Sequence, residues 1–169
     1  EGARLAGMLA PSERDRVHTF AIRRPIGVAG LITPWNFPSA IPAWKLAPAL
    51  VCGNTVVLKP ASAAPLSAWR IVEALDEAGL PKGVLNFVAG PGGALGDALL
   101  AAPPLKAVSF TGSCAIGQRV HELGFELFVD ITPRLAGGDG KAGQCGELAG
   151  EGLGRGDADL GAGVGVEGV

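Results

Sequence analysis

Runs of consecutive apolar residues alternate along this chain with segments whose apolar residues recur at helical spacing. The continuous runs are typical of strands buried on both faces, and they predict strands at 28–33, 54–59, 84–88, 106–110 and 125–130. The periodic segments predict helices at 39–51, 66–78, 93–101 and 113–123. Ahead of them, the pattern predicts a helix at 1–10 and a strand at 15–24.

This alternation of strand and helix, repeated with short connections, predicts an α/β fold. The expected form is a Rossmann-like doubly wound parallel sheet with helices on both faces. Ligands of such sheets bind outside the carboxyl ends of the strands. Asn36, Lys59 and the segments 90–96 and 111–113 all follow predicted strands, so we expect them to converge on one edge.

The character of the chain changes after the last predicted strand. Residues 136–169 contain 13 of the 27 glycines, and no helical or strand period continues there. Glycine loses more backbone entropy on folding than any other residue. We therefore expect two regions: a partial dinucleotide-binding domain at 1–131 and a Gly-rich tail at 132–169 that is disordered or read in a shifted frame.

Composition and charge exclude several classes of function. The chain has 169 residues and a formal net charge of −2, which argues against general binding of nucleic acid or anionic membranes. No apolar stretch is long enough to span a bilayer. The three cysteines show no spacing typical of a metal site or a disulfide framework, so we expect no metal and a cytoplasmic location. A start at Glu1 suggests a fragment or a processed chain.

The segment F-T-G-S at 110–113 places a Gly-Ser pair between a strand and a helix. Free N–H groups and the helix dipole at such a position suit a phosphate. Gly112 would let the ligand approach, and the Ser113 hydroxyl could donate to it. The alternative, equally weighted on local chemistry, is that Ser113 simply caps the helix.

Four other parts of the chain have both a binding and a structural interpretation. Lys59 would reach a ribose or phosphate at the sheet edge, or it would be a surface lysine with a buried stem. Ser62 would bond a ribose hydroxyl or belong to a loop. The glycines that include Gly92 and Gly96 would admit a cofactor or form a plain turn. Asn36 would donate to an oxyanion, or it would bond its own backbone in a turn.

Together these motifs resemble one enzyme family. The motifs are P-W-N-F-P at 34–38, A-W-K at 43–45, P-A-L at 48–50, G-N-T-V-V-L-K-P at 53–60, A-G-L-P at 78–81, G-V-L-N at 83–86 and F-T-G-S at 110–113. Their order and spacing resemble the NAD(P)-dependent aldehyde dehydrogenase superfamily between residues 23 and 121. Within it the chain looks most like the 2-oxoglutarate semialdehyde dehydrogenases of sugar-acid catabolism.

The resemblance implies roles for the matching positions. Asn36 would be the catalytic oxyanion donor. The implied cofactor-binding residues are Ile32, Thr33, Pro34 and Trp35 by the nicotinamide ribose, Lys59 and Ser62 at the adenosine ribose, Gly92 and Gly96 by the adenine, and Phe110, Gly112, Ser113 and Ile116 around the pyrophosphate and adenine. Many relatives carry Glu where this chain has Ser62, so NADP is implied beside NAD. Full-length relatives act on a small-molecule aldehyde and are homo-oligomeric.

Two further residues of the family mechanism are missing. The family's E-L-G-G-K motif would place its glutamate at Leu135, and leucine cannot activate water. Cys145 comes too early and lacks the spacing of the family's G-Q-x-C nucleophile motif. The resemblance therefore implies an aldehyde dehydrogenase fragment that is inactive as it stands. The alternatives are a non-catalytic dinucleotide-binding module and a fragment that pairs with full-length subunits.

Overall fold

The computed structural model describes residues 7–124 and 127–133, which form two sheets and four helices. The elements are β1 (Met8–Ala10), β2 (Thr19–Ala21), β3 (Val28–Ile32), α1 (Ala40–Val51), β4 (Thr55–Lys59), α2 (Pro65–Glu77), β5 (Leu85–Phe87), α3 (Gly92–Leu100), β6 (Leu105–Gly112), α4 (Cys114–Leu123) and β7 (Phe128–Pro133). The alternation predicted from the apolar pattern is confirmed, and the chain is an α/β protein.

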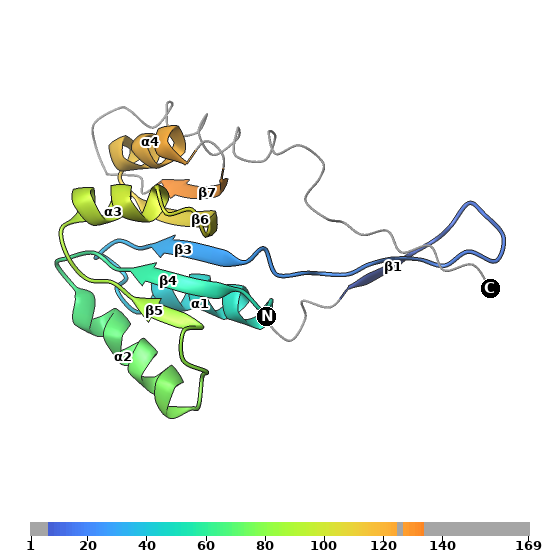
Figure 1. Cartoon of the computed structure of the whole chain (residues 1–169), viewed down its shortest axis with the longest axis horizontal. Coiled ribbons are helices and arrows are strands. Elements are labelled where there is room, and N and C mark those ends of the chain that lie inside the picture. Colours follow the sequence, from blue (N-terminus) through green and yellow to red (C-terminus); the bar gives the residue numbers. More distant parts are fainter. Residues whose placement is uncertain (1–6, 125–126, 134–169) are drawn as a thin grey trace.

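The larger sheet is parallel throughout and has the order β5-β4-β3-β6-β7. The chain moves outward from β3 to β5, then returns across the sheet to place β6 on the other side of β3 (Figure 1). Right-handed crossovers put α1 and α2 on one face and α3 and α4 on the other. The winding direction therefore reverses between β3 and β6, as expected for a doubly wound sheet.

Each face of the sheet has its own apolar core. The α1–α2 face buries Leu31, Leu46, Val56, Leu58 and Ala68. The α3–α4 face buries Leu100, Leu105, Val108, Phe110 and Val120. Burial on both faces explains why the strands read as continuous apolar runs rather than as alternating patterns.

The amino-terminal part differs from the prediction. Residues 8–10 form β1, not a helix, and pair antiparallel with β2 in an arm that projects from the body (Figure 1). Helical spacing of a few apolar residues does not exclude a strand when a partner strand supplies the hydrogen bonds. The predicted strand at 15–24 is reduced to β2, and Arg16, whose φ is 64°, interrupts regular strand geometry before it.

The last predicted strand lies three residues later than expected, as β7 beside β6. Residues 1–6 of the predicted helix and residues 134–169 of the predicted tail lie outside the described residues. Within the described part of the chain, no helix is long and apolar enough to cross a membrane.

A buried asparagine braces the amino-terminal end of the parallel sheet. Asn54, 8% exposed, lies just before β4. Its Oδ1 accepts hydrogen bonds from the backbone N–H groups of Ile26 at 2.7 Å and Gly27 at 3.2 Å. Its Nδ2 donates to the carbonyl of Ala49 in α1 at 3.0 Å. One side chain thus ties the entry to β3, the end of α1 and the start of β4 together.

Candidate functional site

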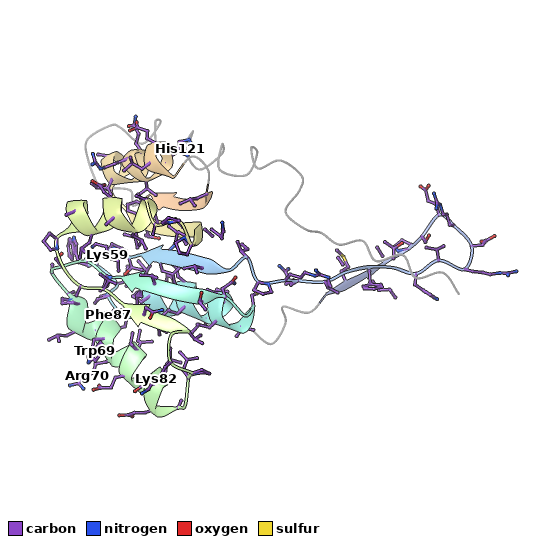
Figure 2. The ribbon with its side chains drawn as sticks, viewed as in Figure 1. Lys59, Trp69, Arg70, Lys82, Phe87 and His121 are labelled. Carbon is purple, nitrogen blue, oxygen red and sulfur yellow. The ribbon has the colours of Figure 1, made fainter. Side chains whose placement is uncertain are left out.

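The loops that follow β3, β4, β5 and β6 leave the sheet at the same edge, because these strands are parallel neighbours. The predicted convergence of Asn36, Lys59 and the segments 90–96 and 111–113 is therefore confirmed. Figure 2 shows Lys59 at this edge, at the opposite end of the sheet from the β1–β2 arm. The edge includes the switch point between β3 and β6, where ligands of doubly wound sheets bind.

The turn after β3 contains two buried oxygen atoms that lack hydrogen bonds. They are Thr33 Oγ1 and Asn36 Oδ1, and neither has a partner among the described residues. The Thr33 backbone N–H is satisfied by the carbonyl of Lys59 at 3.2 Å, so this turn is held to β4. Asn36 Oδ1 does not close a turn on its own backbone, so the turn-forming alternative is wrong for this atom. Unpaired buried oxygens normally carry a free-energy cost, which a ligand or water would remove.

The neighbouring residues of this turn differ in exposure. Ile32 packs against the α3–α4 core. Pro34 is buried beside Thr33, whereas the Trp35 side chain is 56% exposed. The turn therefore presents a large aromatic side chain at the sheet edge while its proline anchors the backbone.

Lys59 is a buried cation at the end of β4. It is only 5% exposed, so the surface-lysine alternative is wrong. Its Nζ donates to the Pro60 carbonyl at 3.2 Å, which is its one hydrogen-bond acceptor among the described residues. Burial lowers the pKa of the Lys59 ammonium, because desolvation disfavours the charged form. An ammonium has three donors, so ligand oxygens would satisfy the remaining ones.

Ser62 joins two of the converging loops. Its hydroxyl donates a hydrogen bond to the carbonyl of Gly90 at 2.6 Å, which ties the loop after β4 to the loop after β5. The hydrogen of this hydroxyl is thereby used within the protein. A ribose hydroxyl could still donate to the Ser62 oxygen, which keeps acceptor capacity.

Glycines at this edge serve two different purposes. A Cβ on Gly92 or Gly96 of α3 would meet no atom within 4 Å, so the space beside them is open. A Cβ on Gly112 would lie 2.4 Å from the Phe110 ring. The bare Gly112 thus makes room for Phe110, whose side chain is 2% exposed in the α3–α4 core, rather than simply admitting a ligand.

Ser113 occupies the N-cap position of α4, but its side chain makes no cap hydrogen bond there. Ser113 is exposed, so both its hydroxyl and the first N–H groups of α4, which have no partner within the helix, are accessible to a ligand. The capping alternative is therefore wrong for the side chain. Ile116, one turn into α4, is 49% exposed.

One polar contact near the site was not singled out from the sequence. Lys45 of α1 donates from Nζ to the Ser109 hydroxyl of β6, on the face of the sheet that α1 covers. The available signal was a single charged residue in an apolar helix, opposite a serine within an apolar strand. Among the described residues, no group of His, Cys, Asp or Glu could hold a metal ion.

Known proteins match this chain over most of its described part. The model of the aldehyde dehydrogenase family matches residues 1–139. The 2,5-dioxopentanoate dehydrogenase of Saccharolobus solfataricus is 48% identical over 120 residues, which are 71% of this chain and 25% of that protein. The alpha-ketoglutarate semialdehyde dehydrogenase of Haloferax volcanii is 48% identical over 137 residues, 81% of this chain and 28% of that protein.

Solved structures agree with the sequence matches. The crystal structure of PnpE in complex with nicotinamide adenine dinucleotide has a TM-score of 0.71 at 40% identity, and the match covers 80% of this chain and 28% of that one. An NADP-dependent enzyme of E. coli has a TM-score of 0.71 at 42% identity, covering 77% and 27%. The chain spans about a quarter of the length of the curated relatives it matches.

Proposed function

The chain belongs to the aldehyde dehydrogenase family, and we propose that residues 1–131 form the dinucleotide-binding region of an enzyme that oxidises an aldehyde to a carboxylate with NAD or NADP. Lys59 carries this proposal. A buried ammonium that donates to one backbone carbonyl is costly unless a ligand supplies further oxygens. It lies at the carboxyl edge of a doubly wound sheet, where ribose and phosphate oxygens would be expected.

The residues at this edge fit a dinucleotide. Lys59 and the Ser62 oxygen would hold the adenosine ribose, and Ser113 with the first N–H groups of α4 would hold the pyrophosphate. Open space beside Gly92 and Gly96 would receive the adenine against Ile116. At the other end of the cofactor, Ile32, Thr33, Pro34 and Trp35 would line the nicotinamide ribose. When bound, the nicotinamide would accept a hydride from the substrate.

Asn36 is proposed as the catalytic residue of this region. Its side-chain amide would donate an N–H to the oxygen that becomes negatively charged when a nucleophile attacks the aldehyde. Asn36 Oδ1 is buried and accepts no hydrogen bond from the described residues, which supports a role toward a ligand rather than in a turn of its own backbone. Asn36 would then stabilise charge without taking part in proton transfer.

The 169 residues alone are proposed to bind the cofactor without turning over. Leu135 stands where the family glutamate would activate water, and Cys145 lacks the spacing of the family nucleophile. Both lie outside the described residues. The semialdehyde dehydrogenases among the similar proteins favour a small semialdehyde such as 2-oxoglutarate semialdehyde as the substrate of the complete enzyme. We propose that the complete enzyme is cytoplasmic and has neither nucleic acid nor a membrane as a partner.

Binding is tested by titrating the full 169-residue chain with NADH and NADPH and following cofactor fluorescence. Lys59→Met should weaken binding at least about tenfold, because it removes charge-assisted hydrogen bonds. Lys82→Met is the matched control, since Lys82 is exposed and lies beyond α2 (Figure 2). No binding by the unchanged chain at millimolar cofactor would overturn the proposed cofactor site.

Turnover is tested separately with the same chain, NAD and 2-oxoglutarate semialdehyde. We expect no cofactor reduction above background. Reduction that disappears in a Cys145→Ser variant would show that Cys145 is the nucleophile and that the proposed inactivity is wrong. Reduction that persists in this variant would also contradict inactivity, but would leave the nucleophile elsewhere.

Exposed aromatic side chains support a second candidate, pairing with other subunits. Trp35 is 56% exposed, Phe37 57% and Trp44 68%, and all three lie in the turn after β3 or in α1. Large exposed apolar groups close together in the chain are typical of an interface. This is tested by mixing the chain with the purified S. solfataricus relative and measuring the molecular mass of the species that elute. Separate elution of the two proteins at all ratios would contradict pairing.

A further inference from the structure

Helices α3 and α4 are joined by an ion pair that has a fixed geometry. Arg119 Nε donates to Asp97 Oδ1 at 3.0 Å, and Arg119 NH2 donates to Asp97 Oδ2 at 2.7 Å. Two parallel N–H···O bonds fix both the separation and the relative orientation of the two groups. The two helices also contact one another on the same face of the sheet (Figure 1).

The two partners lie at the same depth in their helices. Asp97 is five residues after the first residue of α3, and Arg119 is five residues after the first residue of α4. At 1.5 Å per residue, each lies about 7.5 Å from the start of its helix. Both helices begin at the carboxyl edge of the sheet, so the pair spans the gap between them below that edge.

The gap above the ion pair is bordered by groups that leave it open. Gly93 lies four residues before Asp97, on the same side of α3, and a Cβ on Gly93 would meet no atom within 4 Å. On the opposite side, Ile116 lies three residues before Arg119, on the same side of α4, and is 49% exposed. One wall is thus bare backbone and the other is a branched apolar side chain, which together suit a flat ring.

We propose that the Arg119–Asp97 pair is a positioning device that sets the width of the gap between α3 and α4, and thereby the affinity for the purine of the adenosine half of the cofactor. This inference rests on the proposed function. Neither residue is assigned a chemical role. They act through Gly93 and Ile116, which would contact the two faces of the ring.

The electrostatics agree with a geometric role. The hydrogen bonds from Arg119 lower the pKa of the Asp97 carboxyl, so the carboxylate stays ionised across the neutral range. Glu122 on α4 also raises the pKa of Arg119, after the larger contribution from Asp97. Exposed ion pairs contribute little to folding stability. Breaking this pair should therefore change ligand affinity more than it changes the unfolding temperature.

The test measures binding of ADP, nicotinamide mononucleotide and NADH to the full chain by calorimetry. Asp97→Asn and Arg119→Gln should each weaken ADP and NADH about fivefold and leave nicotinamide mononucleotide unchanged, as expected from a change confined to the adenosine half. The double exchange of Asp97→Arg with Arg119→Asp should restore most of the loss, because it rebuilds the pair in reverse. Arg70→Gln, at the exposed Arg70–Glu73 pair, is the control.

Each result decides something different. Unchanged ADP affinity in both single variants overturns the positioning role and leaves the proposed cofactor site standing. A double exchange that does not recover affinity also overturns it, because Arg119 would then act by its own contact. Failure of the unchanged chain to bind ADP or NADH overturns the cofactor site, and the positioning role with it. Equal loss for ADP and nicotinamide mononucleotide, together with a lower unfolding temperature, would show a general structural role instead.

Discussion

The two ends of β4 carry buried polar side chains that differ in one respect. Asn54 before the strand is 8% exposed, and Lys59 at its end is 5% exposed. Asn54 makes three side-chain hydrogen bonds, to Ile26, Gly27 and Ala49. Among the described residues, Lys59 makes one side-chain hydrogen bond, to the carbonyl of the next residue, Pro60. Similar burial therefore accompanies very different degrees of satisfaction.

This difference distinguishes polar groups that hold the fold together from polar groups that could bind a ligand. At the amino-terminal end of the sheet, Asn54 makes its three hydrogen bonds within the protein, which fixes the strands and α1. At the carboxyl end, Thr33 Oγ1 and Asn36 Oδ1 share the incomplete satisfaction of Lys59. Unused capacity of buried polar groups costs free energy, and a protein retains it where a ligand supplies the missing partner.

The largest expected change in stability is at the amino-terminal end of β4, where Asn54 makes its hydrogen bonds within the protein. Asn54→Ala should lower the free energy of unfolding by about 2–4 kcal/mol, because two backbone N–H groups lose their acceptor. Urea denaturation measures it. Asn86→Ala is the control: the Asn86 side chain donates to two backbone carbonyls but is exposed, so a loss of about 1 kcal/mol or less is expected. Equal losses for the two variants would contradict the expectation that the buried hydrogen bonds of Asn54 stabilise the fold more than the exposed ones of Asn86.

A smaller loss is expected where the carboxyl end is tightly packed. Gly112→Ala should cost about 1–3 kcal/mol, because the new methyl group would displace the buried Phe110 ring. Gly93→Ala in α3 meets no atom within 4 Å and should instead be neutral or stabilising by up to about 1 kcal/mol. Thermal unfolding of both variants measures the contrast. An unchanged unfolding temperature for Gly112→Ala would contradict tight packing of the Phe110 ring against Gly112.

Lys59→Met should change stability in the opposite direction to Asn54→Ala. Removing a buried charge with few hydrogen bonds should stabilise the cofactor-free chain by about 1 kcal/mol at neutral pH, although it weakens cofactor binding. Chemical denaturation without cofactor measures it. Destabilisation of several kcal/mol would show that Lys59 is a structural residue like Asn54, and the contrast between the two ends would fail.

The lowered pKa of Lys59 also predicts that the stability of the folded chain depends on pH. Burial lowers the folded-state pKa of Lys59 below its ordinary value of 10.5, so the unfolded chain holds the proton to higher pH. The free energy of unfolding should therefore rise as pH increases from the lowered pKa toward the ordinary one. Below the lowered pKa, the full destabilisation by the buried charge is present. The stability difference between Lys59→Met and the unchanged chain should shrink between these two pKa values. A difference that is constant up to pH 10.5 would contradict a lowered pKa.

The smallest effect is expected away from both ends. Arg70 and Glu73 form an exposed pair on α2, at 2.6 Å. Arg70→Ala should change the free energy of unfolding by less than about 0.5 kcal/mol, since solvent screens exposed pairs. Denaturation at low and high salt checks it. A larger loss would mean that surface pairs contribute as much as the buried contacts compared above.

Most of the body of this fold could be predicted from the sequence, because buried parallel strands leave a strong apolar signal. The strands around 54–59 and 106–110 and the helix at 66–78 agree with β4, β6 and α2 within a few residues. The arm could not be predicted. Its strands are short and mostly exposed, and pairing with a partner decides their structure.

The site was predictable in position but not in detail. Parallel topology alone brings Asn36, Lys59 and Ser113 to one edge. Burial of Lys59, the bond from Ser62 to Gly90 and the Phe110 ring beside Gly112 depend on packing across the fold. The Arg119–Asp97 pair joins residues 22 positions apart and leaves no local pattern.

The reversal of winding between β3 and β6 has a consequence for the order of folding. Val28 pairs with Thr55 on one side and with Leu105 on the other, so the second pairing closes a loop about three times longer. Longer loops cost more entropy to close and form later. We expect β3, α1, β4 and α2 to assemble first. The binding edge would then be completed only when the returning chain docks, so a folding intermediate would be structured but unable to bind nucleotide.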